Sequence, residues 1–93
     1  MFQYQREEFR KNNKTIFMCF NNLITQSVAD GDIIATLHTD CIPIIDIYGI
    51  PLFINNGSFE FGRLDISTNG DIVYHGTTFY NSWVIATGCW MSQ

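Results

Sequence analysis

Apolar and polar side chains alternate along most of this 93-residue chain, with a period of two residues. This period is typical of β-strands that bury one face and expose the other. The segments with this pattern, or with a short continuous apolar run, are residues 2–7, 15–20, 33–37, 42–54, 64–74 and 83–90. Turn-forming residues separate them at intervals typical of a small sandwich or barrel. We therefore expect an all-β fold, a small antiparallel β-sandwich or barrel.

The strongest local signal is a hairpin at residues 64–74, in which Asn69-Gly70 lies between alternating apolar residues. Both residues of an Asn-Gly pair tolerate the positive φ that a tight primed turn demands. The sequence therefore predicts such a turn at this point.

Two features are expected to interrupt strands. Asn21-Asn22 is predicted to end the strand that precedes it, because asparagine is depleted in strands. Pro43 and Pro51 divide the long apolar stretch in the middle of the chain. Because proline lacks the N–H that a central ladder requires, we expect two edge-type or bent strands there instead of one.

Composition limits the classes of partner. The chain is long enough for one domain, and it is 46% hydrophobic and only 15% charged. This charged fraction is low for a small domain, which indicates that another subunit covers part of the surface. Nine acidic and five basic residues give a net charge of −4, and no basic stripe is present to bind nucleic acid. An acidic, aromatic-rich surface is better suited to neutral or polyol ligands.

The cysteines and the first residues of the chain bear on the compartment in which the protein is made. Cys19, Cys41 and Cys89 are odd in number and lack metal-site spacing, so we expect no disulfide framework and three small buried side chains. No apolar stretch reaches the ~18 residues of a membrane span. Residues 1–8 lack the apolar core of a signal peptide. We therefore expect synthesis and maturation in a cytoplasm, without membrane insertion.

The sequence contains no enzyme motif. His38 and His75 are far apart and form no HxH or HExxH pattern, and the chain has no GxSxG elbow or phosphate-binding glycine loop. Glu60 and Asp65 lie on one predicted strand with side chains that point to opposite faces, so a paired-carboxylate glycosidase site would have to recruit another strand. We expect no enzymatic activity, no metal and no cofactor.

The most informative segment for function is residues 74–83, where aromatic rings, a histidine and small polar groups surround one predicted loop. A flat aromatic face beside amide and hydroxyl groups suits a sugar ring, which stacks on the aromatic face and hydrogen-bonds at its edges. The competing interpretation is packing. Trp83 and Trp90 occupy opposite faces of one predicted strand, so at least one of them belongs to the core or to a subunit interface.

A strand-like run at residues 13–23 is followed by segments in a definite order. They are residues 31–37, Pro43, residues 48–54, the hairpin at residues 62–72, and a closing strand with Trp83 and Trp90. This order resembles the C-terminal head domain of phage tail-fibre and baseplate receptor-binding proteins, from phages of Gram-positive and related gut bacteria. The similarity covers about eighty residues and rests on order and spacing. His38 stands where that family has a proline, and Cys41-Ile42 replaces its Tyr-Arg pair, so this element must be held differently here.

The resemblance implies a jelly-roll-like head domain at residues 12–93 that assembles as a homotrimer. Residues 1–11 are then a connecting segment or an extra strand. The head is expected to attach non-covalently to a host cell-surface saccharide, beside other virion proteins at a tail tip, baseplate or fibre. Because binding residues vary in the family, the candidates come from the aromatic segment and the hairpin. They are Tyr74, His75, Tyr80, Asn81 and Trp83, with Arg63 and Asp71 as polar partners. The alternative is a purely structural virion component, such as a head-fibre or baseplate decoration protein.

Overall fold

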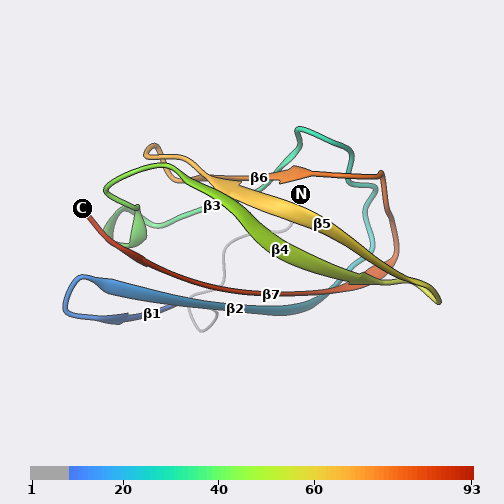
Figure 1. Cartoon of the computed structure of the whole chain (residues 1–93), viewed down its shortest axis with the longest axis horizontal. Helices are drawn as coiled ribbons and strands as arrows, with labels where there is room; N and C mark the ends of the chain where they lie inside the picture. The colour runs from blue at the N-terminus through green and yellow to red at the C-terminus, as the bar shows by residue number, and fades with distance from the viewer. Residues whose placement is uncertain (1–8) are drawn as a thin grey trace.

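The computed structural model of the chain describes residues 9–93, so the strand predicted at residues 2–7 lies outside the described part (Figure 1). Its elements are β1 (Phe9–Asn12), β2 (Thr15–Ile24), β3 (Ile33–Thr36), the 3-10 helix η2 (Thr39–Cys41), β4 (Ile47–Asn55), β5 (Phe59–Ile66), β6 (Asp71–His75) and β7 (Ser82–Met91). The prediction of an all-β fold is confirmed.

The strands form one antiparallel sheet of seven strands, in the order β1-β2-β7-β4-β5-β6-β3. The sheet curls strongly into a half-barrel. As Figure 1 shows, β2 and β7 lie along one side of the curl, β5 and β6 lie along the other, and β4 crosses between them. The inner side of the curl therefore encloses the core.

Period-two alternation fills this inner side. The side chains of Ile16, Met18 and Phe20 are buried on β2, and those of Val84 and Trp90 are buried on β7. Each fully buried side chain of this size stabilises the fold by about 1.5–3 kcal/mol relative to an exposed one. The residues that alternate with the inward-pointing ones on each strand point outward.

The segments at β1 and η2 both pack on the closing strand. Trp90 Nε1 donates a buried hydrogen bond to the backbone oxygen of Cys41 at 2.7 Å. The ring of Phe9 meets Phe20 edge-on, with centroids 5.3 Å apart, and also contacts the Trp90 ring. Trp90 therefore joins β1, β7 and η2 at one end of the core.

Tyr74, on β6, fixes the segment that leads into β7. Its buried hydroxyl donates to the backbone oxygen of Thr77 at 2.6 Å, and its ring meets Phe79 edge-on at 5.1 Å between centroids. Phe79 is also buried, and it exchanges two backbone hydrogen bonds with Val28 at 2.8 and 3.0 Å. These contacts set the point at which the next residue, Tyr80, leaves the core.

β2 continues through Asn21-Asn22 to Ile24, so the prediction that this pair ends the strand is wrong. The two asparagines pair with Ile85 and Val84 in an unbroken ladder to β7. Strand propensities differ by only about 1 kcal/mol across residue types, and the long neighbouring strand outweighs that difference.

β4 is an interior strand although it contains Pro51, so the expectation of edge-type strands is wrong here. The ladder between β4 and β7 covers only Phe53–Asn55, whereas the ladder between β4 and β5 continues past Pro51. Pro51 therefore lies in the part of β4 that no longer pairs with β7. Its missing N–H interrupts no hydrogen bond between β4 and β7. The irregular register between Ile47 and Ile50 marks the expected bend.

β5 and β6 form the predicted hairpin, but the turn differs from the predicted one. The Ser67 N–H donates to the Asp71 oxygen at 3.0 Å, so three residues separate the paired positions. Gly70 has a positive φ of 95°, whereas Asn69 does not. This matches the three-residue hairpin that ends in a left-handed glycine, not the primed turn. The Asn69 side chain accepts hydrogen bonds from the Asp71 N–H and the Ser67 hydroxyl.

Candidate functional site

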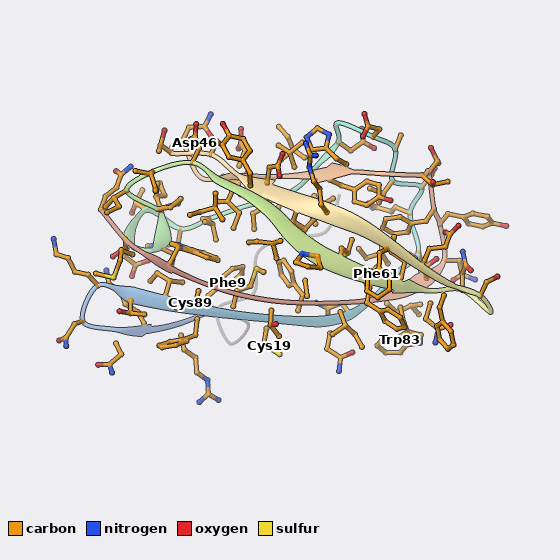
Figure 2. The ribbon with its side chains drawn as sticks, viewed as in Figure 1. Phe9, Cys19, Asp46, Phe61, Trp83 and Cys89 are labelled. Carbon is orange, nitrogen blue, oxygen red and sulfur yellow. The ribbon has the colours of Figure 1, made fainter. Side chains whose placement is uncertain are left out.

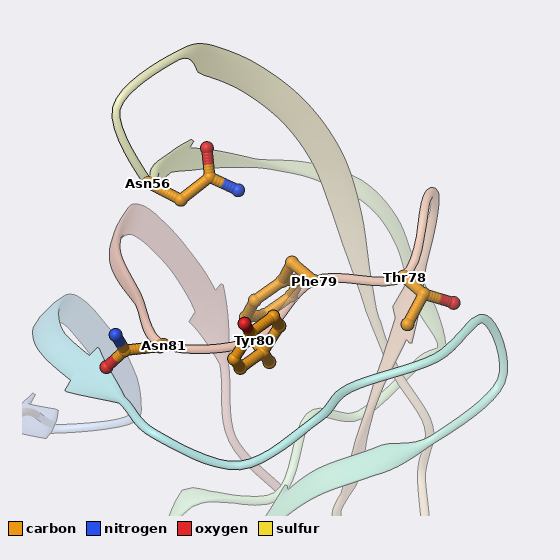
Figure 3. Close-up of a pocket in the computed structure, with 5 residues that line it drawn as sticks. All are labelled: Asn56, Thr78, Phe79, Tyr80 and Asn81. Carbon is orange, nitrogen blue, oxygen red and sulfur yellow. The ribbon is translucent and has the colours of Figure 1, made fainter.

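An open hollow of about 390 Å³ lies between the β4–β5 turn and the segment that enters β7 (Figure 3). Asn56 lines it from the turn, and the other lining residues are Thr78, Phe79, Tyr80 and Asn81. None of these residues is charged. The hollow therefore presents an aromatic ring and neutral polar groups to a ligand.

The backbone at Asn81 shapes this hollow. Asn81 has φ of +49°, in the left-handed region that asparagine tolerates better than most residues. The turn brings Ser82 inward, where its buried hydroxyl donates to the Tyr80 oxygen at 2.8 Å. Tyr80 itself is 69% exposed. The chain is thus fixed on both sides of an exposed tyrosine.

The polar groups of the hollow have unused hydrogen-bonding capacity. Within residues 9–93, the Tyr80 hydroxyl and the Asn81 carboxamide make no hydrogen bond. The Asn56 carboxamide accepts one weak bond through its oxygen, from the Ser58 N–H at 3.4 Å. Amide donors and acceptors beside an exposed ring are the groups that bind the hydroxyls and the C–H face of a sugar.

Trp83 lies next to this hollow but on a different surface. It is 52% exposed and pairs across the sheet with Leu23 of β2 and Asn55 of β4. Trp90 is 4% exposed on the other face of the same strand, so the predicted opposite placement of the two tryptophans is confirmed. The Trp83 side chain belongs to the outer face of the sheet and does not line the hollow.

The structure does not bring all the candidate residues together. Tyr74 is fully buried, so its ring supports the loop from inside and offers no face to a ligand. Asp71 follows the β5–β6 turn, at the opposite end of β5 from the β4–β5 turn, and its carboxylate accepts from the Thr36 hydroxyl at 3.3 Å. It is separated from the hollow by the length of β5.

Arg63 and His75 belong to a separate charged cluster on β5 and β6. His75 lies between two carboxylates, with Nδ1 3.2 Å from Asp30 Oδ1 and Nε2 3.4 Å from Asp65 Oδ2. Arg63 Nη2 is 3.3 Å from the same Asp65 oxygen. The polar groups of this cluster therefore contact one another and not the hollow.

A smaller cavity of about 120 Å³ adjoins this cluster, with Asp46, Tyr48 and Asp65 among its lining residues. The Tyr48 hydroxyl donates to Asp46 Oδ2 at 3.3 Å, and the nearby Asp46 carboxylate raises the pKa of Tyr48 above its usual value. The other Asp46 oxygen accepts the Thr68 N–H, and Asp65 accepts the Gly49 N–H. The carboxylates thus anchor the backbone of neighbouring turns, and no metal-binding group of three or more side chains occurs within residues 9–93.

Two of the three cysteines are exposed, so the prediction of three buried thiols is wrong for Cys19 and Cys89. Both occupy the outward phase of their strands, β2 and β7. Cys41 is buried as predicted. Their neighbours Met18, Phe20 and Trp90 are buried on the opposite, inward phase.

Sequence reasoning missed Asn56 as a lining residue. Its signal was the run Asn55-Asn56-Gly57-Ser58, which has the composition of a turn between strands. The position of this turn beside Tyr80 depends on the order of strands in the sheet. The order places β4 next to β7 although 25 residues lie between Asn55 and Asn81 in the sequence.

Comparison of the chain with models of protein families and with curated proteins finds no match. The helices among residues 9–93 include none with the length and apolar character needed to cross a membrane.

Proposed function

We propose that this protein is the receptor-binding head domain of a phage virion, which attaches non-covalently to a host cell-surface saccharide through the hollow beside Tyr80. The observation that carries the proposal is the exposed Tyr80 ring beside the Asn56 and Asn81 carboxamides. No charged side chain lines the hollow, so the ligand that fits is a neutral sugar. In this proposal a C–H face of the sugar stacks on the Tyr80 ring.

The polar edges of the sugar then meet neutral donors and acceptors from two segments. Asn56 approaches from the β4–β5 turn, and Asn81 lies on the segment before β7 (Figure 3). Such contacts specify the positions of hydroxyl groups without a metal or a cofactor. Single-site affinity for a neutral sugar is low, so attachment depends on several sites acting together.

Several sites arise if the half-barrel is one subunit of a jelly-roll-like homotrimer, displayed with other virion proteins at a tail tip, baseplate or fibre. The chain is then made in the host cytoplasm and assembled onto the virion. The low charged fraction of 15% supports assembly, because a covered surface needs few charges. Multivalent display raises avidity without any new contact.

A second candidate is a purely structural virion component. The observation that favours it is the set of exposed apolar side chains on the outer face of the sheet, which suits packing against other subunits. This candidate requires no ligand in the hollow. The two proposals therefore differ in what happens when the hollow is altered.

The test is binding to a glycan array and to host-envelope saccharide fractions, with the protein displayed in many copies on a bead. Tyr80→Ala removes the stacking face, and Asn81→Gly removes a carboxamide while it permits the left-handed backbone. We expect each variant to lose at least about tenfold in apparent affinity, equivalent to ~1.4 kcal/mol. Tyr48→Ala is the matched control, because Tyr48 is an equally exposed tyrosine outside the hollow.

Loss of binding in the two hollow variants and retention in Tyr48→Ala would support the proposal. Absence of binding by the folded wild-type protein to every envelope fraction would favour the structural candidate. Unchanged binding by Tyr80→Ala would place any saccharide site elsewhere on the molecule.

A further inference from the structure

The outer side of the sheet carries a continuous set of exposed or half-buried apolar side chains. We call this set the outer aromatic face, and it consists of Leu23, Phe53, Phe59, Phe61, Trp83 and Ile85. The set spans four adjacent strands, β2, β7, β4 and β5. Phe61 and Trp83 lie close to the same end of the molecule in Figure 2.

The ladder register shows that these residues are neighbours. Leu23 lies opposite Trp83, and Ile85 lies opposite Phe53. Phe53 in turn lies opposite Phe61, with ring centroids 5.3 Å apart. The Phe53 ring also stacks on Phe59 at 5.3 Å. Cross-strand contacts of this kind hold the rings as one surface.

The exposed area of this face is large for a small domain. Phe59 and Phe61 are each 71% exposed, Trp83 is 52% exposed, and Leu23 and Ile85 are 46% and 42% exposed. With aromatic side chains of 150–250 Å² each, the exposed apolar area is on the order of 500 Å². A stable interface takes about 800 Å² from each partner, so this face supplies more than half of that area.

The outer face is also free of charge over its central strands. Three strands carry no charged residue on their outward side. They are β2 from Phe17 to Leu23, β7 from Trp83 to Met91, and β4 from Pro51 to Asn55. On the fourth strand, β5, the outward-pointing Arg63 and Asp65 follow Phe61 and pair with each other at 3.3 Å. A charged partner would require a matching basic or acidic patch here. An uncharged aromatic partner surface fits, and another copy of this chain carries one.

We infer that the outer aromatic face is covered by another copy of this chain, so that copies meet through this side of the sheet. The second copy supplies the layer that an antiparallel sheet with two apolar faces requires, as in sandwiches whose sheets pack about 10 Å apart. This inference rests on the assembly part of the proposed function and names its surface. It does not depend on saccharide binding in the hollow.

The two exposed thiols report on the state of this side of the sheet. Cys19 lies opposite Thr87, and Cys89 lies opposite Phe17, so both thiols point outward on the same side of the sheet as the outer aromatic face. Figure 2 shows Cys19 directed away from the body of the molecule. Cys41 is buried in the core and serves as an internal reference. When copies cover the sheet, the reaction of Cys19 and Cys89 with a thiol reagent slows.

The first experiment measures mass by light scattering at micromolar concentration for the full chain and three variants. Phe61→Lys and Trp83→Lys place a charge in the outer aromatic face. Tyr48→Lys is the matched control, because Tyr48 is 73% exposed and lies outside the face. We expect the wild type and Tyr48→Lys to have a multiple of 10.7 kDa, and the two face variants to have the mass of one chain.

The second experiment measures labelling of Cys19 and Cys89 with a coloured thiol reagent across a dilution series of the wild type. We expect labelling to accelerate by about tenfold or more on dilution, as the assembly dissociates. A wild-type chain that is monomeric at micromolar concentration would overturn the inference, as would labelling that does not depend on concentration. The dilution series remains decisive if the lysine variants fail to fold.

These outcomes are separate from those of the saccharide test. A monomeric wild type that binds saccharide when displayed on beads would overturn the interface and leave the hollow as a binding site. An assembled wild type that binds no saccharide would do the reverse.

Discussion

The ring of Tyr74 lies directly against the backbone of Gly62 on the inner side of the half-barrel. A Cβ at position 62 would overlap the Tyr74 ring at Cε1, and one at Gly76 would meet its hydroxyl. Tyr74 pairs with Leu64 across β5 and β6, so its side chain reaches diagonally along β5 to the space over Gly62. A large buried ring and a missing side chain therefore complement each other.

Gly62→Ala is expected to destabilise the protein by about 1–3 kcal/mol, because the added methyl forces the Tyr74 ring or the β5 backbone to move. Urea unfolding followed by fluorescence measures the change. Gly88→Ala is the control, since its Cβ would lie 3.2 Å from Cδ1 of Ile50, the far end of a flexible side chain. Equal losses in the two variants would contradict the account.

Stability is expected to fall at alkaline pH because of Tyr74. Burial raises the pKa of Tyr74 above its usual value of 10.0, so the folded state keeps the phenol neutral. The unfolded chain releases this proton at lower pH. The stabilisation is therefore complete below about pH 10 and is lost as pH rises toward the raised folded-state pKa.

Urea titrations between pH 8 and pH 11 test this dependence. Tyr74→Phe should show a shallower decline than the wild type, and Tyr80→Phe, which removes an exposed hydroxyl, should follow the wild type. Because the pKa of Tyr48 is also raised, some decline remains in Tyr74→Phe. A decline of the same slope in Tyr74→Phe and the wild type would refute the assignment.

Trp90→Phe is expected to cost about 1–3 kcal/mol. The substitution removes the buried hydrogen bond that Trp90 Nε1 donates to the Cys41 oxygen, and a phenyl ring fills less of the core than the indole. Tyr48→Phe keeps an aromatic ring at an exposed position outside the outer aromatic face and should change stability by less than about 0.5 kcal/mol. Thermal unfolding of both variants, followed by circular dichroism, makes the comparison; similar midpoints would show that the Trp90 hydrogen bond carries no net stability.

Substitutions at Asn81 should separate the effect of its backbone conformation on stability from the effect of its side chain. Asn81→Ala is expected to lower the free energy of unfolding by about 1 kcal/mol or more. The left-handed backbone conformation is unfavourable for alanine, which lacks a polar side chain to hydrogen-bond locally. Asn81→Gly should be within a few tenths of a kcal/mol of the wild type. Thermal unfolding measures both. A more stable alanine variant would show that the positive φ is not maintained.

The strands were predictable where burial alternates strictly. Trp83 and Trp90 fall on opposite faces because they lie seven residues apart on one strand, and this parity needs only the sequence. The prediction that Asn21-Asn22 ends a strand is wrong because the low strand propensity of asparagine is a weak effect. The decisive factor is the pairing of ten residues with β7, which is distant in the sequence. When both alternating sets of side chains on a strand are apolar, the sequence does not determine which set faces the core. The prediction that Cys19 and Cys89 are buried is wrong for this reason.

The candidate site was predictable in part for a similar reason. Tyr80 and Asn81 are local neighbours, so their shared segment indicated their proximity. Asn56 joins them only because the sheet order brings β4 beside β7, and Asp71 is excluded because β5 carries it to the other end of the sheet. Long-range order of this kind follows from the packing of the whole core.

The order of the sheet also limits how copies of the chain can associate. In the described part of the chain, both edges of the sheet are strands of only four residues, β1 and β3. Short edges offer few unpaired N–H and C=O groups to an incoming strand, so growth by strand addition is disfavoured. The proposed association through side chains of the outer aromatic face does not use these edges. The half-barrel therefore exposes an apolar face for association between copies and offers little edge for the strand addition that leads to fibrils.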